Sequence, residues 1–403
     1  MNDMKPNHPS VITHALRTPI GKYGGILRDV RPDDLGAIIM SALVESSGIN
    51  PAEIDDVLWG CANQAGEDNR NVGRMSALLA GIPQSVPANT VNRLCGSSLD
   101  TIIQGARAIW SGDASMILAG GVESMSRAPY SVPKNQAGSF GNVTAFDTAL
   151  GWRYPNPKME AMFPLESMGE TAENVAVKYS ISRSEQDEFA LASHHKAVIA
   201  QKEGRFKGEI VPVRIEQKEG NHLVLDTDEG PRHDTSMEKL AKLTPVFRKN
   251  GSVTPGNSSS LNDGAAGVLM MSEEKSRELG LKPLARIIGT GVAGVDPRFM
   301  GIGPIPAAQR ALRKANITID NLDLIELNEA FASQSIAVIR DLNIDVKKLN
   351  PNGGAIALGH PLGCSGARIM TTLLHEMIRR NAHYGLATMC IGVGQGIAVV
   401  VQR

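Results

Sequence analysis

Short apolar runs of strand length alternate along this chain with longer segments of helical periodicity. Six runs have the length and composition of buried strands: residues 56–60, 115–121, 267–272, 324–327, 385–390 and 396–401. Between them, apolar residues recur at the spacing of a helix with one buried face, most clearly after Cys95 and after His360. Because strands that alternate with helices form a sheet covered by helices, the pattern predicts an α/β fold.

The two ends of the chain resemble distant copies of each other. Residues 54–64 (IDDVLWGCANQ) are similar to residues 322–332 (LDLIELNEAFA), since in each an acidic residue precedes a short strand that opens into a polar loop. Later in each half a residue with a reactive side chain, Cys95 or His360, precedes a helix and then a strand. A duplicated fold would bring the equivalent loops of both halves to one shared face.

The middle of the chain breaks this alternation. It is richer in Pro, Lys, Glu and Asp, and its composition is typical of loops and short helices. We therefore expect an N-terminal half (1–127), an inserted loop domain that covers the site (128–261), a return to the N-terminal half (262–284) and a C-terminal half (285–403). The length of 403 residues also favours more than one domain.

The overall composition argues against several classes of function. With a net charge of −1, the chain offers no electrostatic case for binding nucleic acid or an anionic membrane. The apolar run 385–400 is interrupted by glycines and is shorter than the roughly 20 residues of a membrane-spanning helix, so we expect two buried strands joined by a turn. The first residues contain no apolar core of signal-peptide length, and cysteines are few, which favours a cytoplasmic protein.

Cys95 is the first candidate for chemistry. It stands at the start of a helical pattern in NRLCGSSLD, and a helix N-terminus favours a thiolate. Gly96 and Ser97 would leave room for a substrate, although a small apolar residue at a junction of strand and helix is the alternative. The remaining cysteines are Cys61, Cys364 and Cys390. No pair of the four has CxxC spacing, so neither a zinc site nor a thioredoxin-type site is expected.

Two further motifs place polar side chains where catalysis could use them. His360, in GGAIALGHPLGCSGAR, precedes a helix between Gly359 and Pro361, and the glycine allows close approach of a ligand. The alternative is a histidine satisfied by hydrogen bonds within its loop. Asn328, in LNEAFA, ends a buried strand, where its amide could orient a water or an oxyanion or could simply cap a helix.

The motif CIGVGQG surrounds Cys390 with glycines. Gly392, Gly394 and Gly396 would expose backbone N–H groups beside the thiol, and such groups can form an oxyanion hole. A tight hairpin is the alternative. None of these four motifs is decisive by itself.

Taken together, the four motifs closely resemble the thiolase family. The similarity covers nearly the whole chain and includes QAGEDNRNVGRM (64–75), GGVESMSRAPY (120–130), MGETAENVA (168–176), SEQDEFALAS (184–193) and VTPGNSSSLNDGAA (253–266). The resemblance implies a fold of two pseudo-repeated halves that form a five-layered αβαβα core, with a loop domain inserted in the first half. It also implies a homo-oligomer, either a dimer or a tetramer.

The resemblance implies a role for each motif residue. Cys95 would accept the acyl group, and His360 would activate it as a base. Cys390 would take a proton from the methyl group of acetyl-CoA and return it in the reverse direction. Gly392, with the N–H of Cys95, would hold the oxyanion of the thioester, and Asn328, through a water, would act with His360 on the enolate.

The implied activity is CoA-dependent cleavage of 3-oxoacyl-CoA to acetyl-CoA and a shortened acyl-CoA, together with the reverse condensation. CoA would lie over the loop domain, in contact with Ser259, Arg232, Met168 and Phe331. It is a substrate in this chemistry, so no cofactor and no metal are expected.

Three residues depart from common family patterns. Pro255 stands where alanine is common and Ser260 where glycine is common, which puts the geometry of the loop beside Ser259 in question. Ser167 precedes the methionine of MGETAE, where the biosynthetic subgroup usually has histidine. Ser167 therefore favours a degradative thiolase over the alternative, an acetoacetyl-CoA-forming acetyl-CoA acetyltransferase.

The substrate is suggested by two stretches. Residues 60–75 and 146–159 resemble the 3-oxoadipyl-CoA thiolases of aromatic-compound degradation more than short-chain thiolases. The acyl chain of that substrate ends in a carboxylate, which needs a cation in a closed pocket. Arg153, between Trp152 and Tyr154, is the candidate, and the alternative is an arginine on a solvated loop or in a subunit contact.

Three other functions are less well supported. A decarboxylating ketoacyl synthase shares the fold but pairs its cysteine with His/His or His/Asn, so Cys390 argues against it. A non-catalytic acyl-CoA binding protein on the same scaffold would lack one of Cys95, His360 and Cys390, and all three are present. A redox or metal protein does not fit the cysteine spacing.

Overall fold

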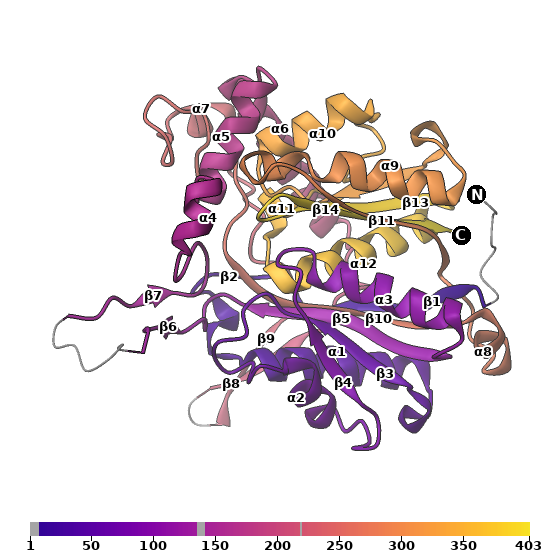
Figure 1. Cartoon of the computed structure of the whole chain (residues 1–403). Coiled ribbons are helices and arrows are strands. Elements are labelled where there is room, and N and C mark those ends of the chain that lie inside the picture. Colours follow the sequence, from indigo (N-terminus) through magenta and orange to yellow (C-terminus); the bar gives the residue numbers. More distant parts are fainter. Residues whose placement is uncertain (1–7, 135–141, 218–219) are drawn as a thin grey trace.

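Two long helices form the middle layer of the computed structural model, which describes residues 8–134, 142–217 and 220–403. Helices α3 (Ser97–Ser111) and α12 (Leu362–Arg380) pack against each other between two halves of one β-sheet (Figure 1). Most of α12 is buried, because it contacts strands of both halves. This position explains why the sequence after Cys95 and after His360 is so regularly apolar.

The sheet runs in the order β4-β3-β5-β10-β1 in the N-terminal half and continues as β11-β14-β13-β12 in the C-terminal half. The halves are joined where the start of β1 pairs with the start of β11. The strands are β1 (Ser10–Arg17), β3 (Asp56–Gly60), β4 (Ala88–Val91), β5 (Met116–Ser124), β10 (Asn262–Ser272), β11 (Ala285–Gly294), β12 (Leu324–Leu327), β13 (Tyr384–Ile391) and β14 (Gln395–Gln402), and the short β2 (Gly21–Lys22) pairs with β10.

The two halves repeat one topology. In each, a parallel pair, β3–β5 or β12–β13, is extended by antiparallel strands, β10 and β1 or β14 and β11. Asp55 and Asp323 make the same hydrogen bonds at equivalent positions. Each carboxylate accepts two backbone N–H groups at the start of the parallel partner strand. These come from Ser115 and Met116 at β5, and from His383 and Tyr384 at β13. The predicted duplication is therefore confirmed.

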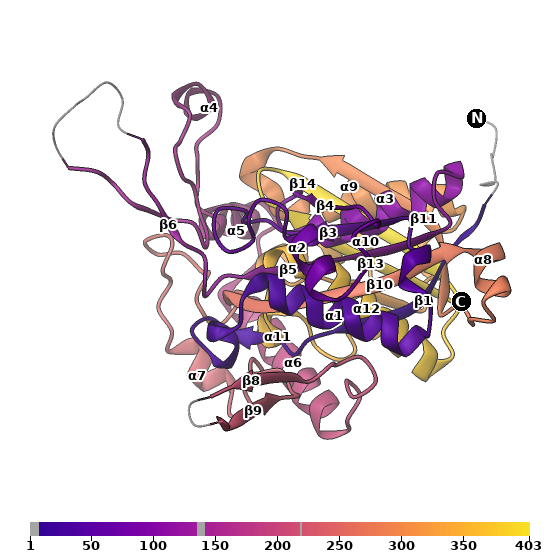
Figure 2. The same ribbon diagram turned by 90° about the horizontal axis from the view of Figure 1, so that it is seen from below.

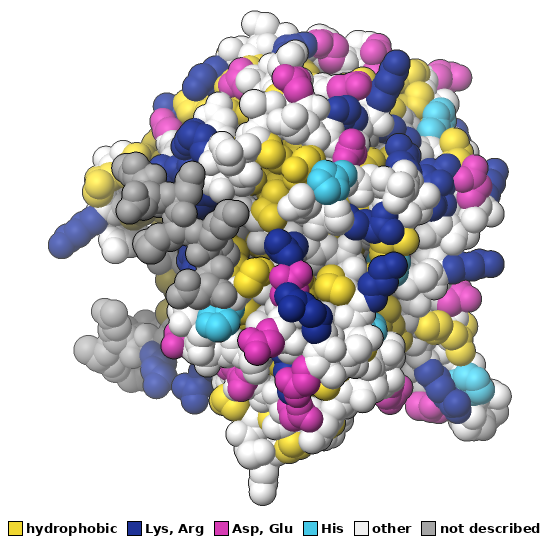
Figure 3. Space-filling view, turned by 90° about the vertical axis from the view of Figure 1, so that its right-hand side faces the viewer, with side chains coloured by type: hydrophobic (Ala, Val, Ile, Leu, Met, Phe, Trp, Pro, Cys, Tyr) yellow, Lys and Arg dark blue, Asp and Glu magenta, His cyan; other side chains and the backbone are white. Residues whose placement is uncertain are grey.

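Outer helices complete five layers. Helices α1 (Pro32–Ser47) and α2 (Val72–Leu79) lie below the N-terminal half of the sheet, and α9 (Pro304–Ala315) and α10 (Ala332–Leu342) lie above the C-terminal half (Figure 1). The αβαβα architecture agrees with the resemblance. On the face at the right of Figure 1, basic and acidic side chains are interspersed, as the small net charge suggests (Figure 3).

The six predicted strands are confirmed, and so are the helices after Cys95 and His360. Strands β1 and β11 were not predicted. Each carries a register irregularity, between Ile12 and His14 or between Ile287 and Gly289, which disturbs the regular alternation that marks a strand in sequence. No helix among the described residues has the length and apolar character needed to cross a membrane.

The predicted insertion, residues 128–261, contains more regular structure than its composition suggested. It holds α4 (Pro157–Met162), α5 (Met168–Lys178), α6 (Arg183–Lys202), α7 (Met237–Ala241), and the hairpins β6 (Tyr130–Ser131)–β7 (Phe146–Asp147) and β8 (Val213–Glu216)–β9 (His222–Leu225). Figure 2 shows α4 standing off the core. The expectation of loops and short helices is wrong for α6, a 20-residue helix that begins with a Ser182–Glu185 capping box.

A buried ion network attaches the insertion to the core. Arg17, at the end of β1, is fully buried, and its guanidinium donates to Glu209 Oε1 at 2.6 Å and to both carboxylate oxygens of Asp228 at 2.7 and 3.0 Å. Phe206 lies under the guanidinium, 5.1 Å from ring centroid to Cζ. Because both carboxylates belong to the insertion, Arg17 fixes the position of that segment.

We expect Arg17→Met to lower the free energy of unfolding by about 3–5 kcal/mol, because it leaves two carboxylates buried without their partner. Urea unfolding followed by circular dichroism measures the change. Arg214→Met is the matched control, since Arg214 pairs with Glu216 in solvent and its loss should leave stability nearly unchanged. Equal effects of the two substitutions would contradict this account.

Candidate active site

Cys95 lies in a tight turn directly before α3. Leu94 adopts a left-handed conformation with φ of 48°, and the Ser97 hydroxyl accepts the N–H of Arg93 at 2.9 Å and donates to Leu94 O at 2.5 Å. The turn therefore holds the thiol at the N-terminus of the helix. A Cβ at Gly96 would lie 2.5 Å from Ile391, so the turn is also pressed against the end of β13.

Cys390 and Gly392 come from the hairpin between β13 and β14. Val393 and Gly394 have φ of 61° and 77°, and the turn they form directs the N–H of Gly392 at the sulfur of Cys95. Cys390 is buried, and a negative charge on Cys95 acts on its thiol. The expected strand–turn–strand is confirmed, and it packs against the turn that carries Cys95, since a Cβ at Gly392 would lie 3.5 Å from Leu94.

Both thiols are neutral in the resting site. Burial raises the pKa of Cys95 to about 11, although the N–H groups of Gly392 and of Cys95 itself act in the opposite direction. Burial, and then the charge of Cys95, raise the pKa of Cys390 well above its ordinary value. Each thiol therefore needs a base that accepts its proton before it can react.

His360 lies between the short helix α11 (Ala355–Leu358) and α12. Its backbone N–H donates to Asn262 Oδ1 at 2.9 Å, and the Ser260 hydroxyl donates to the same oxygen at 2.8 Å. Gly359 has φ of 110°, and a Cβ there would lie 2.4 Å from the Asn262 side chain. Ser260, a departure from the common family pattern, thus helps to fix the segment that carries His360.

The tautomer of His360 follows from its partner. Ser365 Oγ donates to Pro361 O at 2.8 Å and lies 2.6 Å from His360 Nδ1, so the hydroxyl accepts the Nδ1 proton. Nε2 is then left with its lone pair. Burial, assisted by the charge of Arg368, lowers the pKa of His360 to about 3, which keeps the imidazole neutral and able to accept a proton.

Asn328 follows β12 directly and is completely buried. Its backbone N–H donates to Thr388 O at 3.0 Å, and its Nδ2 lies 3.5 and 3.4 Å from the two ring nitrogens of His360. Within the described part of the chain, its Oδ1 has no hydrogen-bond partner. A buried acceptor without a partner suits a bound water or a substrate group.

The N-terminal ends of α3 and α12 contact each other. The N–H of Ala367 donates to Ser98 Oγ at 2.9 Å, and a Cβ at Gly363 would meet the end of β5. The segments that precede these ends carry Cys95 and His360. The residues expected to be catalytic therefore gather at one end of the middle layer, while their chemical roles stay predictions.

Three of the expected contact residues form a rim on the side of the insertion. Met168 and Phe331 pack in the same apolar cluster as Cys390. The Met168 sulfur would lie 3.5 Å from a Cβ at Gly392. Ser259, half-buried, donates its N–H to Ala330 O at 2.9 Å, beside Phe331.

Phe247 is a rim residue that the sequence did not suggest. Its ring meets Phe331 edge to face, with centroids 6.4 Å apart, and it covers Gly169. It lies in a loop without regular spacing of apolar residues, so its position depends on tertiary contacts. Aromatic residues make up only 4% of the chain, so each one outside a predicted strand or helix is a candidate for a binding surface, and this was the one signal for Phe247 in the sequence.

Two expected contact residues lie outside this group. Arg232 is exposed, and its backbone N–H donates to His194 Nδ1 on α6 at 3.2 Å. Arg153 is half-buried and donates to Thr148 O at 3.2 Å. Among the described residues, no group of three or more His, Cys, Asp and Glu side chains is arranged to hold a metal ion.

The chain matches the family models "Thiolase, N-terminal domain" over residues 10–274 and "Thiolase, C-terminal domain" over residues 281–403. It is 55% identical over 396 residues to a beta-ketoadipyl-CoA thiolase of Acinetobacter baylyi, which covers 97% of this chain and 98% of the relative. It is 52% identical over 395 residues to the 3-oxoadipyl-CoA/3-oxo-5,6-dehydrosuberyl-CoA thiolase of Escherichia coli, with the same coverage.

A solved structure gives the same result. The crystal structure of the Bacillus anthracis acetyl-CoA acetyltransferase superposes with a TM-score of 0.92, at 43% identity, over 98% of each chain. Both family models, full-length relatives and a solved structure therefore agree: the chain belongs to the thiolase family.

Proposed function

We propose that this thiolase cleaves 3-oxoacyl-CoA with free CoA, giving acetyl-CoA and a shortened acyl-CoA through an acyl-Cys95 intermediate, and that it catalyses the reverse condensation. One observation carries the proposal. The hairpin that carries Cys390 and Gly392 packs on the turn that carries Cys95, since a Cβ at Gly96 would lie 2.5 Å from Ile391 and a Cβ at Gly392 would lie 3.5 Å from Leu94. Acyl transfer alone needs one thiol, whereas breaking a carbon–carbon bond also needs a group that protonates the leaving carbon.

In the cleavage direction, Cys95 attacks the 3-oxo carbon while His360 Nε2 takes the thiol proton. The bond between C2 and C3 then breaks, and its electron pair forms the enolate of acetyl-CoA, which takes a proton from Cys390. The shortened acyl group stays on Cys95. CoA next gives its thiol proton to Cys390 and attacks the thioester, and His360 returns its proton to Cys95.

Charge that develops on oxygen is stabilised by neutral dipoles. The N–H groups of Gly392 and Cys95, which both act on the thiol in the resting site, bind the oxyanion of the thioester. The partnerless Oδ1 of Asn328 holds a water, and this water acts with His360 on the enolate oxygen of acetyl-CoA. These groups are buried, so each dipole acts more strongly than it would in water.

CoA enters across the rim. Its pantetheine arm passes along the contacting rings of Phe247 and Phe331, next to Met168, and Ser259 lies where the arm reaches the surface. Arg232, exposed on the insertion, is available to the phosphates. CoA is a substrate here, and the chemistry requires neither a cofactor nor a metal.

The enzyme acts as a homo-oligomer, either a dimer or a tetramer. β4 ends the described sheet, and its residues are half-buried or exposed, which leaves a strand edge available to a second copy. Leu78 and Leu79 of the neighbouring helix α2 are 44% and 57% exposed. A symmetric contact would cover both features at once.

The acyl group is that of 3-oxoadipyl-CoA or a similar diacid thioester. The relatives from Acinetobacter baylyi and Escherichia coli carry substrate names of this class. Arg153 has one described hydrogen bond, to Thr148 O, and four further N–H groups that could meet a carboxylate. An acetyl-CoA acetyltransferase is the second candidate, supported by the Bacillus anthracis structure, but Ser167 stands where that subgroup usually has histidine.

Cys95→Ser should abolish formation of the acyl-enzyme, because an alcohol is much less acidic than a thiol and is a far weaker nucleophile at neutral pH. Mass spectrometry after incubation with acetyl-CoA measures the adduct. Cys364→Ser is the matched control, since Cys364 is buried in the core and should leave labelling in place. An adduct that persists on another residue of the Cys95 variant would overturn the assignment.

Cys390→Ala should separate the two half-reactions. Acetylation of Cys95 does not require a second thiol, so labelling should survive, whereas carbon–carbon cleavage should fall by about 100-fold or more. Stopped-flow cleavage of acetoacetyl-CoA measures the second step. Equal loss of both steps would show that Cys390 only supports the structure.

Wild-type enzyme should cleave 3-oxoadipyl-CoA with higher kcat/KM than an uncharged thioester of equal length. Arg153→Ala should remove much of this difference, about 1.5–3 kcal/mol for one charge-assisted hydrogen bond. Lys158→Ala, an exposed cation in the same segment, is the control and should leave the preference unchanged. If the wild type cleaves the neutral thioester equally well, the enzyme is a general 3-oxoacyl-CoA thiolase.

A further inference from the structure

A buried carboxylate from the N-terminal half holds the helix that follows His360. Glu123, near the end of β5, is 2% exposed. Its Oε2 accepts the backbone N–H groups of Ala62 at 2.9 Å and Gly363 at 2.7 Å, and its Oε1 accepts that of Asn63 at 3.1 Å. One side chain thus joins the loop after β3 to the first turn of α12.

The contact is tight on the side of the helix. Gly363 is the second residue of α12 and the third after His360. A Cβ at Gly363 would lie 2.7 Å from Cys61 Cα and from Val122 O, and 2.9 Å from Glu123 Oε2. The helix backbone therefore rests directly on the carboxylate, and a small movement of Glu123 would move the turn that carries His360.

We propose that Glu123, as an ionised carboxylate, is a positioning residue that holds the N-terminus of α12, and through it His360, against Cys95. The inference rests on the proposed roles of His360 and Cys95. Three N–H donors and the positive end of a 19-residue helix all favour the ionised form, which presents acceptors on both oxygens. A protonated carboxyl would instead direct its O–H toward these N–H donors, which cannot accept it.

The ionised form is not guaranteed at every working pH. Burial, with a smaller contribution from the charge of Asp68, raises the pKa of Glu123 to about 7, against the effect of the three N–H donors. Other titratable groups around it are thiols: Cys61 Sγ is 3.8 Å from Oε1, and Cys95 and Cys364 respond to its charge. Glu123 therefore changes its charge within the range in which enzymes are assayed.

The ratio of wild-type to Glu123→Gln acetylation rates tests the proposal. Single-turnover acetylation of Cys95 by acetyl-CoA is measured from about pH 5.5 to 9, and the ratio cancels every ionisation that the two proteins share. We expect a ratio near one at low pH, where Glu123 is protonated. It should rise to a plateau of up to about 100-fold at high pH, because a small displacement of a catalytic base costs that much.

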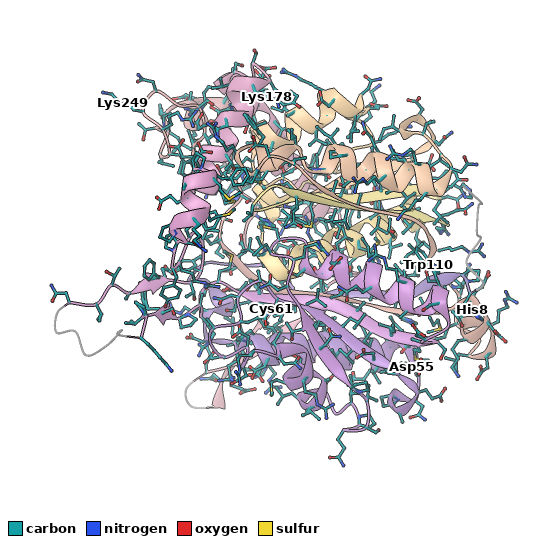
Figure 4. The ribbon with its side chains drawn as sticks, in the orientation of Figure 1. His8, Asp55, Cys61, Trp110, Lys178 and Lys249 are labelled. Carbon is teal, nitrogen blue, oxygen red and sulfur yellow. The ribbon has the colours of Figure 1, made fainter. Side chains whose placement is uncertain are left out.

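Asp55→Asn is the matched control. Asp55 also accepts backbone N–H groups around the start of β5, at Ser115 and Met116, but it lies at the far end of that strand from the loop at Cys61 (Figure 4). Its ratio should stay near one at all pH values. A Glu123→Gln ratio that is independent of pH, whatever its size, would overturn the proposal, because a merely structural loss acts equally at every pH.

A second measurement needs neither the variant nor the thiolase activity. The rate at which iodoacetamide alkylates Cys95 is measured in the wild type as a function of pH. A plot of log rate against pH should have a slope of about two below pH 7, where both Glu123 and Cys95 must lose a proton. Above pH 7 only Cys95 must do so, and the slope should be about one. A slope of one throughout would overturn the role of Glu123. Failure of acetylation together with the steep alkylation profile would instead reject the proposed function.

Discussion

The contact between the N-terminal ends of α3 and α12 is the interaction on which the site depends. Each helix begins within two residues of a reactive side chain, Cys95 or His360, so the distance between the helices sets the distance between the two. A Cβ at Gly366 would lie 2.4 Å from the backbone of Leu99, which means that the helices are close to backbone contact. Catalytic geometry is thus built into the core and does not depend on a surface loop.

Burial in this core determines the resting chemistry. It raises the pKa of both thiols and lowers that of His360, so the site holds neutral groups until a substrate arrives. In the mechanism that we propose, neutral dipoles such as the N–H of Gly392 then act on charge that forms during the reaction. The same burial keeps water away from a thioester that would otherwise hydrolyse.

Much of the fold could be predicted from sequence because it depends on local patterns. The strand β3 and the helix after Cys95 follow from apolar spacing, and the family motifs identify the thiols and His360. Other features depend on contacts between distant residues. The bond from Ser260 to Asn262, the placement of Phe247 at the rim and the three N–H donors of Glu123 leave no mark in local spacing, so sequence reasoning missed them.

The strand order is palindromic about the junction of β1 and β11, and α3 packs against its own equivalent, α12. This is the geometry of a symmetric dimer whose two subunits have become one chain. In a true dimer, any change in one copy appears in both. Covalent fusion removes that restriction, so one copy could specialise in carrying the nucleophile while the other acquired the base and the second thiol. The asymmetry of the chemistry is a consequence of that linkage.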